Sequence, residues 1–242
     1  MVEACEKLHV IPTTEGAADM PLDLTHAIDG FGGNEHQFPV SPLYDDVVNL
    51  VAKSGIYYTP TFIIGEYDGP GSENYYFQTT DVYHNPKMRR LVPHEILESK
   101  TSRLMWYRRD EYVYPEGARA AAAISKAGGK VCVGGHGELQ GLSFHWQLWS
   151  LQSGGMSNLE ALRAATLNGA EAIGLAQDLG SLEPGKLADL VVLSKDPLQD
   201  IQNTTSIRYV MKNGELYDGD TLDQVWPKPQ TTGPFWWWND HP

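Results

Sequence analysis

Three residues that can bind a metal or carry a proton follow predicted strands: Glu15, His36 and His136. Glu15 comes directly after the extended segment 9–14, His36 closes the second predicted strand, and His136 follows the strand predicted over 130–133. The active sites of parallel barrels lie at the carboxyl ends of the strands, because the loops there converge on the barrel axis. These three side chains are therefore the candidates for a site of metal binding or proton transfer.

The elements that must position these residues alternate between strand and helix. The run 56–64 is rich in β-branched and aromatic residues and is typical of a strand, although Pro60 marks a bulge or an end. It carries no candidate ligand at its end. Helices are predicted over residues 2–8, 22–28, 43–53 (capped by Ser41), 93–109, 116–126 and 139–151. Alternating strands and helices imply parallel βαβ units, with four strands in all.

Residues 65–93 interrupt this alternation. They contain many tyrosines, and loops of this length in compact domains are usually functional or disordered. We predict an ordered loop that acts as a lid. Its aromatic part, 67–83, could alternatively bind a small acyl or peptidic ligand.

The chain changes character after a predicted helix that Ser157 caps and Gly174 ends. Short strands are predicted over 187–193 and 207–211, and the turn residues Asn213-Gly214 follow the second. The tail from residue 226 contains three adjacent tryptophans, Trp236–Trp238. Exposed tryptophans are an association hazard, so we expect them to dock on this subunit or on a neighbour.

The composition excludes some partners. A formal net charge of −13 argues against nucleic-acid binding, because phosphate-binding surfaces need an excess of Lys and Arg. No run approaches the roughly 20 apolar residues of a membrane helix, so no membrane partner is expected. Cys5 and Cys132 are interpreted as buried free thiols rather than a disulfide. The N-terminal residues lack the features of a signal peptide. Their pattern indicates the end of a helix that leads into a strand, which suggests a fragment of a longer protein.

Five stretches of the sequence together resemble the amidohydrolase superfamily. Residues 156–193 resemble its C-terminal signature, in which a helix after the last barrel strand leads into a β-sandwich appendage. The other four are THAIDG (25–30), EHQFPVSPLYDDV (35–47), GIYYTPTFI (55–63) and GGHGELQGLSFHWQLW (134–149). Within the superfamily the chain resembles the imidazolonepropionase- and dipeptidase-like branch, in particular the subgroup often fused to a TolB-type propeller. The resemblance covers essentially the whole chain.

This resemblance implies a (β/α)8 TIM-type barrel with one or two divalent metals, zinc foremost. The family's ligands are a His-x-His pair on the first strand, Lys or Glu on the fourth, histidines on the fifth and sixth, and Asp on the eighth. The metal polarises the scissile carbonyl and activates water, while the Asp takes the proton. His36 matches the sixth-strand histidine, Glu15 has the spacing of the fifth-strand histidine, and His136 stands in place of the eighth-strand Asp.

Each of these assignments has an alternative. Glu15 is a ligand or a simple loop carboxylate, and His36 is a ligand or a structural or substrate-side histidine. His136 is a base or ligand, or it packs within its loop. A histidine cannot supply the anionic oxygen of the usual Asp, and Glu138, two residues on, could compensate.

Two further residues are candidates for contact with substrate. Tyr58 lies on the predicted strand 56–64. His145 lies on the apolar helix that follows His136, where the alternative is a core histidine whose hydrogen bonds are satisfied within the protein.

The chain departs from the family pattern in what it lacks. No His-x-His occurs in it, and about four βα units are absent. We therefore expect residues 1–179 to form the C-terminal half of a barrel, 180–220 a segment of a composite β-sandwich, and 221–242 an extended tail. A half-barrel exposes two strand edges, so we expect a homo-oligomer or pairing with a missing N-terminal half.

Two functions from different classes follow. The first is a metal-dependent hydrolase of C–N bonds in a small amide, cyclic amide or dipeptide. The second is a non-catalytic fragment that folds and associates without a complete metal site. The sequence leaves the compartment open between the cytoplasm and, for a propeller-fused parent, export.

Overall fold

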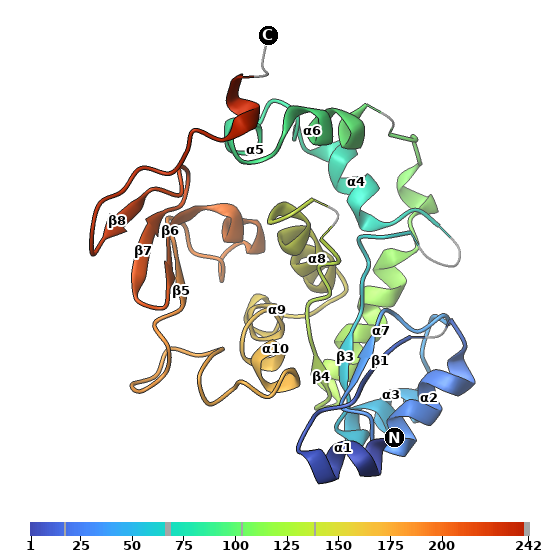
Figure 1. Cartoon of the computed structure of the whole chain (residues 1–242). Helices are drawn as coiled ribbons and strands as arrows, with labels where there is room; N and C mark the ends of the chain where they lie inside the picture. Colours follow the sequence, from blue (N-terminus) through green and yellow to red (C-terminus); the bar gives the residue numbers. More distant parts are fainter. Residues whose placement is uncertain (17, 66–68, 103, 138, 240–242) are drawn as a thin grey trace.

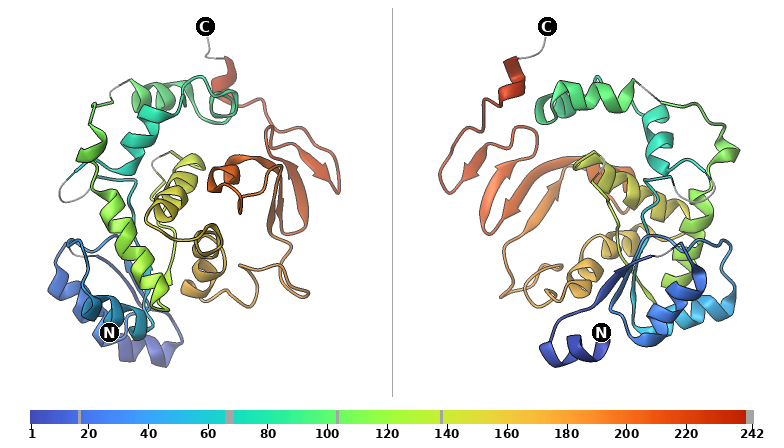
Figure 2. Two further views of the ribbon diagram at one scale, coloured as in Figure 1. Left: turned by 180° about the vertical axis from the view of Figure 1, so that it is seen from behind. Right: turned by 45° about the vertical axis from the view of Figure 1, so that its right-hand side comes forward.

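The computed structural model describes residues 1–16, 18–65, 69–102, 104–137 and 139–239. These residues form one parallel and one antiparallel sheet, each of four strands. Figure 1 shows the sheets on opposite sides of the molecule with helices α8 (Leu142–Ser153), α9 (Asn158–Ala164) and α10 (Leu167–Ala172) between them, and the views in Figure 2 agree. The predicted α/β class is confirmed at this level.

The parallel sheet consists of β1 (Thr13–Glu15), β2 (Gly33–Glu35), β3 (Tyr57–Thr59) and β4 (Lys130–Val131), in that order. All neighbouring pairs are parallel, as the alternation of strands and helices predicted. Glu15, Glu35 and Thr59 are aligned across the first three strands. The carboxyl ends of these strands therefore lie in one row.

Helices cover one face of this sheet. Helix α1 (Val2–Leu8) precedes β1, α2 (Met20–Asp29) and α3 (Asp45–Ser54) connect the first three strands, and α7 (Tyr114–Lys126) leads into β4. The apolar sides of α2, α3 and α7 enclose a core that includes Val51, Ile56, Tyr58, Ile124 and Val131. Successive strand residues face opposite sides of a sheet. Because Tyr58 faces the helices, its neighbour Thr59 and the residues aligned with it face the opposite, inner side.

The third strand is shorter than the prediction over 56–64, because β3 ends at Thr59. The residue that follows, Pro60, has no backbone N–H to donate to a neighbouring strand. The N–H of Thr61 donates instead to Oε1 of Gln37, at 3.1 Å. The apolar run continues, but its N–H groups at Thr61 and Phe62 donate to side chains rather than to a neighbouring strand.

Gln147 of α8 takes the place of a neighbouring strand for this segment. Its Oε1 accepts a hydrogen bond from Phe62 N at 2.8 Å, and its Nε2 donates to Pro60 O at 2.6 Å. Gln147 is fully buried. If its amide were removed, two backbone groups would lose their partner in a place without water, which is costly.

We predict that Gln147→Leu lowers the free energy of unfolding by about 3 kcal/mol, because it leaves the two backbone groups unsatisfied. Urea unfolding of the purified protein measures this. Gln152→Leu, on the same helix, is the matched control and should change stability by less than about 0.5 kcal/mol. Equal stability of the two variants would show that the Gln147 amide does not hold the segment.

The prediction of a long loop over 65–93 is wrong. This region contains α4 (Ser72–Thr79) and α5 (Pro86–Leu91), followed by α6 (His94–Thr101) and the 3-10 turn Arg109–Glu111. Tyr76 and Phe77 of α4 pack against Trp146 of α8, with ring centroids 5.5 and 4.9 Å apart. The aromatic residues form a second core rather than a lid.

The predicted helix from Ser157 to Gly174 is split into α9 and α10. The capping prediction is confirmed, because Ser157 Oγ accepts from Glu160 N and the Glu160 carboxylate accepts from Ser157 N. Helix α9 ends at Ala164, and Gly174 follows the second helix in the left-handed conformation, with φ of 74°.

The antiparallel sheet consists of β5 (Leu190–Leu193), β6 (Ile207–Lys212), β7 (Glu215–Asp218) and β8 (Gln224–Trp226), and the 3-10 turn Ile201–Thr205 precedes β6. Asn213 and Gly214 both have positive φ at the turn that joins β6 to β7. Positive φ at both central residues is typical of a two-residue hairpin turn. In the described residues no strand side chain of this sheet is fully buried.

The tryptophan-rich tail docks on its own chain, which is one of the two alternatives predicted from the sequence, the other being docking on a neighbouring subunit. The indole N–H groups of Trp237 and Trp238 both donate to Arg90 O, at 3.1 and 2.8 Å. The Arg90 guanidinium lies 4.3 Å from the Trp238 ring centroid, and Phe235 stacks on Trp237. The tail thereby joins the antiparallel sheet to α5. Among the described residues, no helix has the length and apolar character needed to cross a bilayer.

Candidate functional site

Glu15, His36 and His136 meet at the carboxyl ends of the parallel strands. Glu15 Oε1 lies 3.3 Å from His36 Nε2. The rings of His36 and His136 are edge to face, with centroids 5.8 Å apart. The Glu15 side chain is 80% exposed and that of His36 13%, so one partner faces solvent while the other is held by its surroundings.

Both histidines have an unusual backbone conformation. His36 has φ of 70° and His136 has φ of 47°, in the left-handed region that residues other than glycine rarely adopt. Such outliers persist only where the surrounding structure imposes them, and they cluster at functional sites. Asn34, fully buried, contributes here, since its Nδ2 donates to the carbonyls of Glu35 and His36, each at 3.4 Å.

A glycine lets the loops after β3 and β4 approach each other. A Cβ at Gly134 would lie 2.6 Å from Pro60 O and 2.7 Å from Thr61 Oγ1. Any larger residue would push the loops apart. The close approach sets the path of the chain that leads from β4 to His136.

The inner face of the sheet carries polar groups that the sequence analysis did not assign. Burial raises the pKa of the Glu35 carboxyl, against the opposing effects of a hydrogen bond from Thr59 and of the nearby His36. Burial also raises the pKa of the Cys132 thiol to about 12, so it is protonated and unreactive at neutral pH. The alternation of side chains along β2 places Glu35 on this face. Only the register between β1 and β2 shows that Glu35 is aligned with Glu15.

A lower row on the same face connects to α10. Lys130 Nζ lies 2.7 Å from Glu171 Oε2, and the Tyr57 hydroxyl donates to the same oxygen at 3.3 Å. Asn168 Nδ2 donates to Val131 O of β4, at 2.8 Å. The expectation of two exposed strand edges is therefore only partly met, because α10 covers the β4 edge.

The two predicted substrate-binding residues lie elsewhere. Tyr58 is 1% exposed, stacks on Phe38 and accepts a hydrogen bond from Phe38 N, which places it in the core. His145 Nδ1 lies 3.1 Å from Thr204 Oγ1, between α8 and the 3-10 turn before β6. This geometry favours the alternative of a satisfied packing histidine. Glu138 lies outside the described residues.

A metal ion would find only part of its ligands here. Oxygen and nitrogen ligands at about 2.0–2.2 Å from zinc stand a little over 3 Å apart in a tetrahedral site, and the Glu15–His36 separation suits that geometry. Among the described residues, however, no group of three His, Cys, Asp or Glu side chains is arranged to hold a metal ion. The pair fits two positions of a site and does not complete it.

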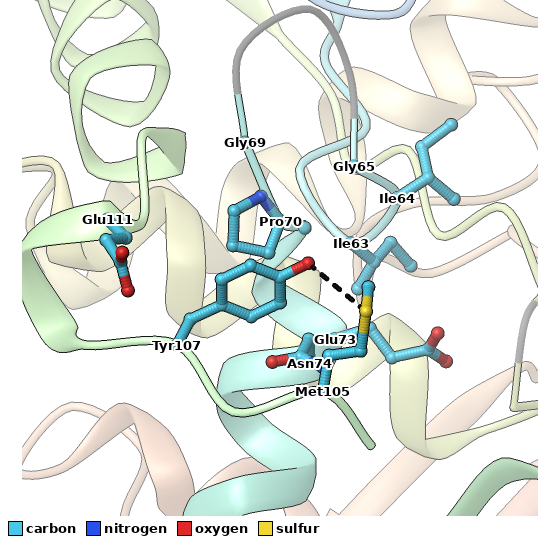
Figure 3. A pocket seen from close by; sticks show the side chains of 11 residues that line it. Ile63, Ile64, Gly65, Gly69, Pro70, Glu73, Asn74, Met105, Tyr107 and Glu111 are labelled. Carbon is cyan, nitrogen blue, oxygen red and sulfur yellow. Dashed lines mark hydrogen bonds between the residues drawn. The ribbon is translucent and has the colours of Figure 1, made fainter. Parts of the chain in front are cut away.

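A larger cavity of about 780 Å³ lies beyond the end of β3 and contains none of the predicted site residues. Figure 3 shows the ring of Tyr107 among its lining residues, with the hydroxyl directed at Met105 Sδ. Asn74 Oδ1 accepts hydrogen bonds from Tyr112 and Gln78. This polar group already has protein partners, and the cavity by itself indicates no ligand.

The chain belongs to the amidohydrolase family, whose model matches residues 1–217. It is similar to ochratoxinase from Aspergillus niger, 37% identical over 75 residues that make up 29% of this chain and 16% of that enzyme. It is also similar to imidazolonepropionase from Geobacillus kaustophilus, 42% identical over 69 residues, 27% of this chain and 16% of that enzyme.

The fold is similar to that of a solved Xaa-Pro dipeptidase with bound methionine. The TM-score is 0.61 at 22% sequence identity, and the match covers 90% of this chain and 47% of the dipeptidase chain. The chain thus spans about half of the length of this solved relative.

The burial of His145 should make the stability of the protein depend on pH. Burial, with a smaller effect of the nearby Lys87, lowers the pKa of His145 to about 4. The unfolded chain, with a pKa near 6.5, then binds the proton more readily, so stability from this group is complete above about pH 6.5 and is lost as pH falls toward 4.

Between pH 7 and pH 5 we expect the free energy of unfolding of the wild-type protein to fall by about 2 kcal/mol more than that of His145→Gln, because each pKa unit corresponds to about 1.4 kcal/mol. Urea unfolding at both pH values measures the difference, and the variant serves as the reference for all other titrating groups. An identical pH dependence in the two proteins would contradict the assignment of a neutral, buried imidazole.

Proposed function

We propose that this chain provides part of the active site of a hydrolase that cleaves C–N bonds in small amides, cyclic amides or dipeptides with the help of a divalent metal, zinc foremost. The observation that supports this most strongly is the 3.3 Å approach of Glu15 Oε1 to His36 Nε2 at the carboxyl ends of adjacent parallel strands. Family membership supports the hydrolytic class. The relatives named as ochratoxinase, imidazolonepropionase and Xaa-Pro dipeptidase suggest the amide and peptide substrates.

In this proposal Glu15 and His36 hold the metal through Oε1 and Nε2. When bound, the metal supplies Lewis acidity toward the scissile carbonyl. His36 is fixed for this role by the buried turn that Asn34 braces, whereas the exposed Glu15 can adjust to the ion. A buried, oriented nitrogen and a mobile carboxylate together form a pair that can bind without rebuilding the loops.

His136 is the proposed base. Its ring lies beside that of His36, with centroids 5.8 Å apart. An imidazole at this distance reaches a water held near the pair and accepts its proton through a ring nitrogen. His136 has a left-handed backbone in the loop after β4, and its ring reaches that of His36 at the end of β2.

The remaining metal ligands come, in this proposal, from a second polypeptide segment. A hydrolytic zinc site usually has three protein ligands and one open position, and the described residues provide a pair. A first half-barrel or a second copy of the chain, placed along the edge of β1, would bring further ligands to the same rim. The barrel half over 1–179, the sandwich segment 180–220 and the tail 221–242 are the units we propose for the assembly.

The test is metal binding by the purified 242-residue chain, followed by the visible spectrum of Co²⁺, which reports the ligands of a site that suits zinc. We predict that the wild-type chain binds Co²⁺ and that Glu15→Gln or His36→Ala weakens binding at least tenfold. His84→Ala is the matched control, because His84 also pairs with a carboxylate, that of Asp81 at 2.9 Å, but on the exposed surface.

Equal binding by wild type and His36→Ala would refute the metal role of the pair. Circular dichroism of each variant shows whether the fold is retained. Hydrolysis of a panel of small amides and dipeptides, measured with the Co²⁺-loaded chain alone and after addition of a first half-barrel, tests whether the second segment is required. Activity that is independent of Glu15 and His36 would contradict the proposal.

A further inference from the structure

A smaller cavity, of about 160 Å³, is lined in part by residues 37–41, which directly follow His36 in the sequence. It lies between the loop that follows His36 and the first turns of α7. Its walls are mostly apolar and include Phe38, Val40, Phe62, Val113, Tyr114 and Gly117. A cavity of about 150 Å³ with apolar walls is large enough to hold a benzene molecule. The slot therefore has the size of one ring or one branched aliphatic group.

The glycine in α7 is part of how this slot is built. Gly117 stands within the helix Tyr114–Lys126, where glycine is among the poorest helix formers. A Cβ at this position would lie 2.8 Å from Phe62 Cε1. The glycine lets the Phe62 ring lie against the helix and keeps the space beside it clear. Any side chain here would displace the ring that forms one wall.

Three polar side chains, those of Gln37, Ser41 and Glu116, also line the slot. Gln37 lines the slot and directly follows His36, and its Oε1 accepts the hydrogen bond from Thr61 N at 3.1 Å. This bond orients the amide, and in the part of the chain that the structure describes Gln37 Nε2 has no recorded acceptor. Mostly apolar walls with a small number of polar groups are typical of small-molecule sites, in which the polar groups fix the orientation of the ligand.

We propose that this slot is a specificity site that takes a compact apolar group of the substrate, with Gln37 Nε2 donating to an adjacent carbonyl oxygen. The proposal rests on the hydrolase function proposed above and defines its substrate class as amides that carry a single ring or a branched aliphatic group beside a carbonyl. The loop 36–41 links the two sites, because His36 turns toward Glu15 and the next residues form the wall of the slot.

Binding of benzamide, followed by ligand-detected NMR on the intact metal-free chain, tests this inference. Benzamide has a ring and a carbonyl, and acetamide is the matched probe without the ring. We expect benzamide to bind with a millimolar dissociation constant and acetamide at least tenfold more weakly. Val40→Trp, at a position 49% exposed, should fill the mouth of the slot and weaken benzamide binding at least tenfold.

Two further variants separate the slot from general effects. Val191→Trp, on β5 and 54% exposed, introduces the same side chain elsewhere and should leave benzamide binding unchanged. Gln37→Glu keeps an acceptor for Thr61 N but removes the N–H donor, and we expect severalfold weaker binding of benzamide. Equal affinity of wild type and Val40→Trp, or equal affinity for benzamide and acetamide, would overturn the inference.

This experiment is independent of the metal test. It needs neither metal nor turnover, whereas the Co²⁺ titration measures a metal affinity that depends on Glu15 and His36. If benzamide did not bind but Co²⁺ did, only the proposed substrate class would be refuted. If benzamide bound but the separate Co²⁺ titration showed no metal binding by the chain, the metal role of Glu15 and His36 would be refuted while the slot remained.

Discussion

The alignment of the first three parallel strands is the constraint on which the site depends. The register places Glu15, Glu35 and Thr59 side by side at the carboxyl edge of the sheet, on the face turned away from α2, α3 and α7. His36 follows this row directly, and the loop after β4 brings His136 to it. A shift of one residue in any of these short strands would turn the row toward the helical core. The proposed chemistry therefore depends on strand pairing more than on any single side chain.

Side-chain amides maintain that alignment where the strands end. Asn34 braces the turn at His36, Gln37 and Gln147 receive the backbone N–H groups that follow Pro60, and Asn168 donates to the edge carbonyl of β4. The strands have only two or three residues each, so they contribute few backbone hydrogen bonds of their own. Of these amides Asn34 and Gln147 are fully buried, and they are costly to remove because the groups that they satisfy would be left without a partner.

The sequence predicted those parts of the fold that depend on local pattern. Alternating strands and helices gave the parallel sheet, and Ser157 with Glu160 gave the start of a helix, because a capping box involves neighbours in sequence. The position of Glu15, His36 and His136 after strands was enough to bring them to one rim. Their roles as ligands and base remain proposals.

Other features could not be read from the chain because they depend on distant partners. The tyrosines of α4 looked like a lid until Trp146, some seventy residues away, provided a core for them. Tyr58 looked available to a substrate, but its face is decided by the helices α3 and α7. Gln147 lies within an apolar helix with no local signal of its role, and Glu35 gains its environment only from the register of three strands.

In the proposed function, Glu15 and His36 hold one metal ion between them. Anomalous diffraction from a zinc-soaked crystal of the chain tests it most directly. We predict a peak at the ends of β1 and β2, at about 2.0–2.2 Å from both Glu15 Oε1 and His36 Nε2. A fully occupied zinc at other residues, with none between these two atoms, would contradict it.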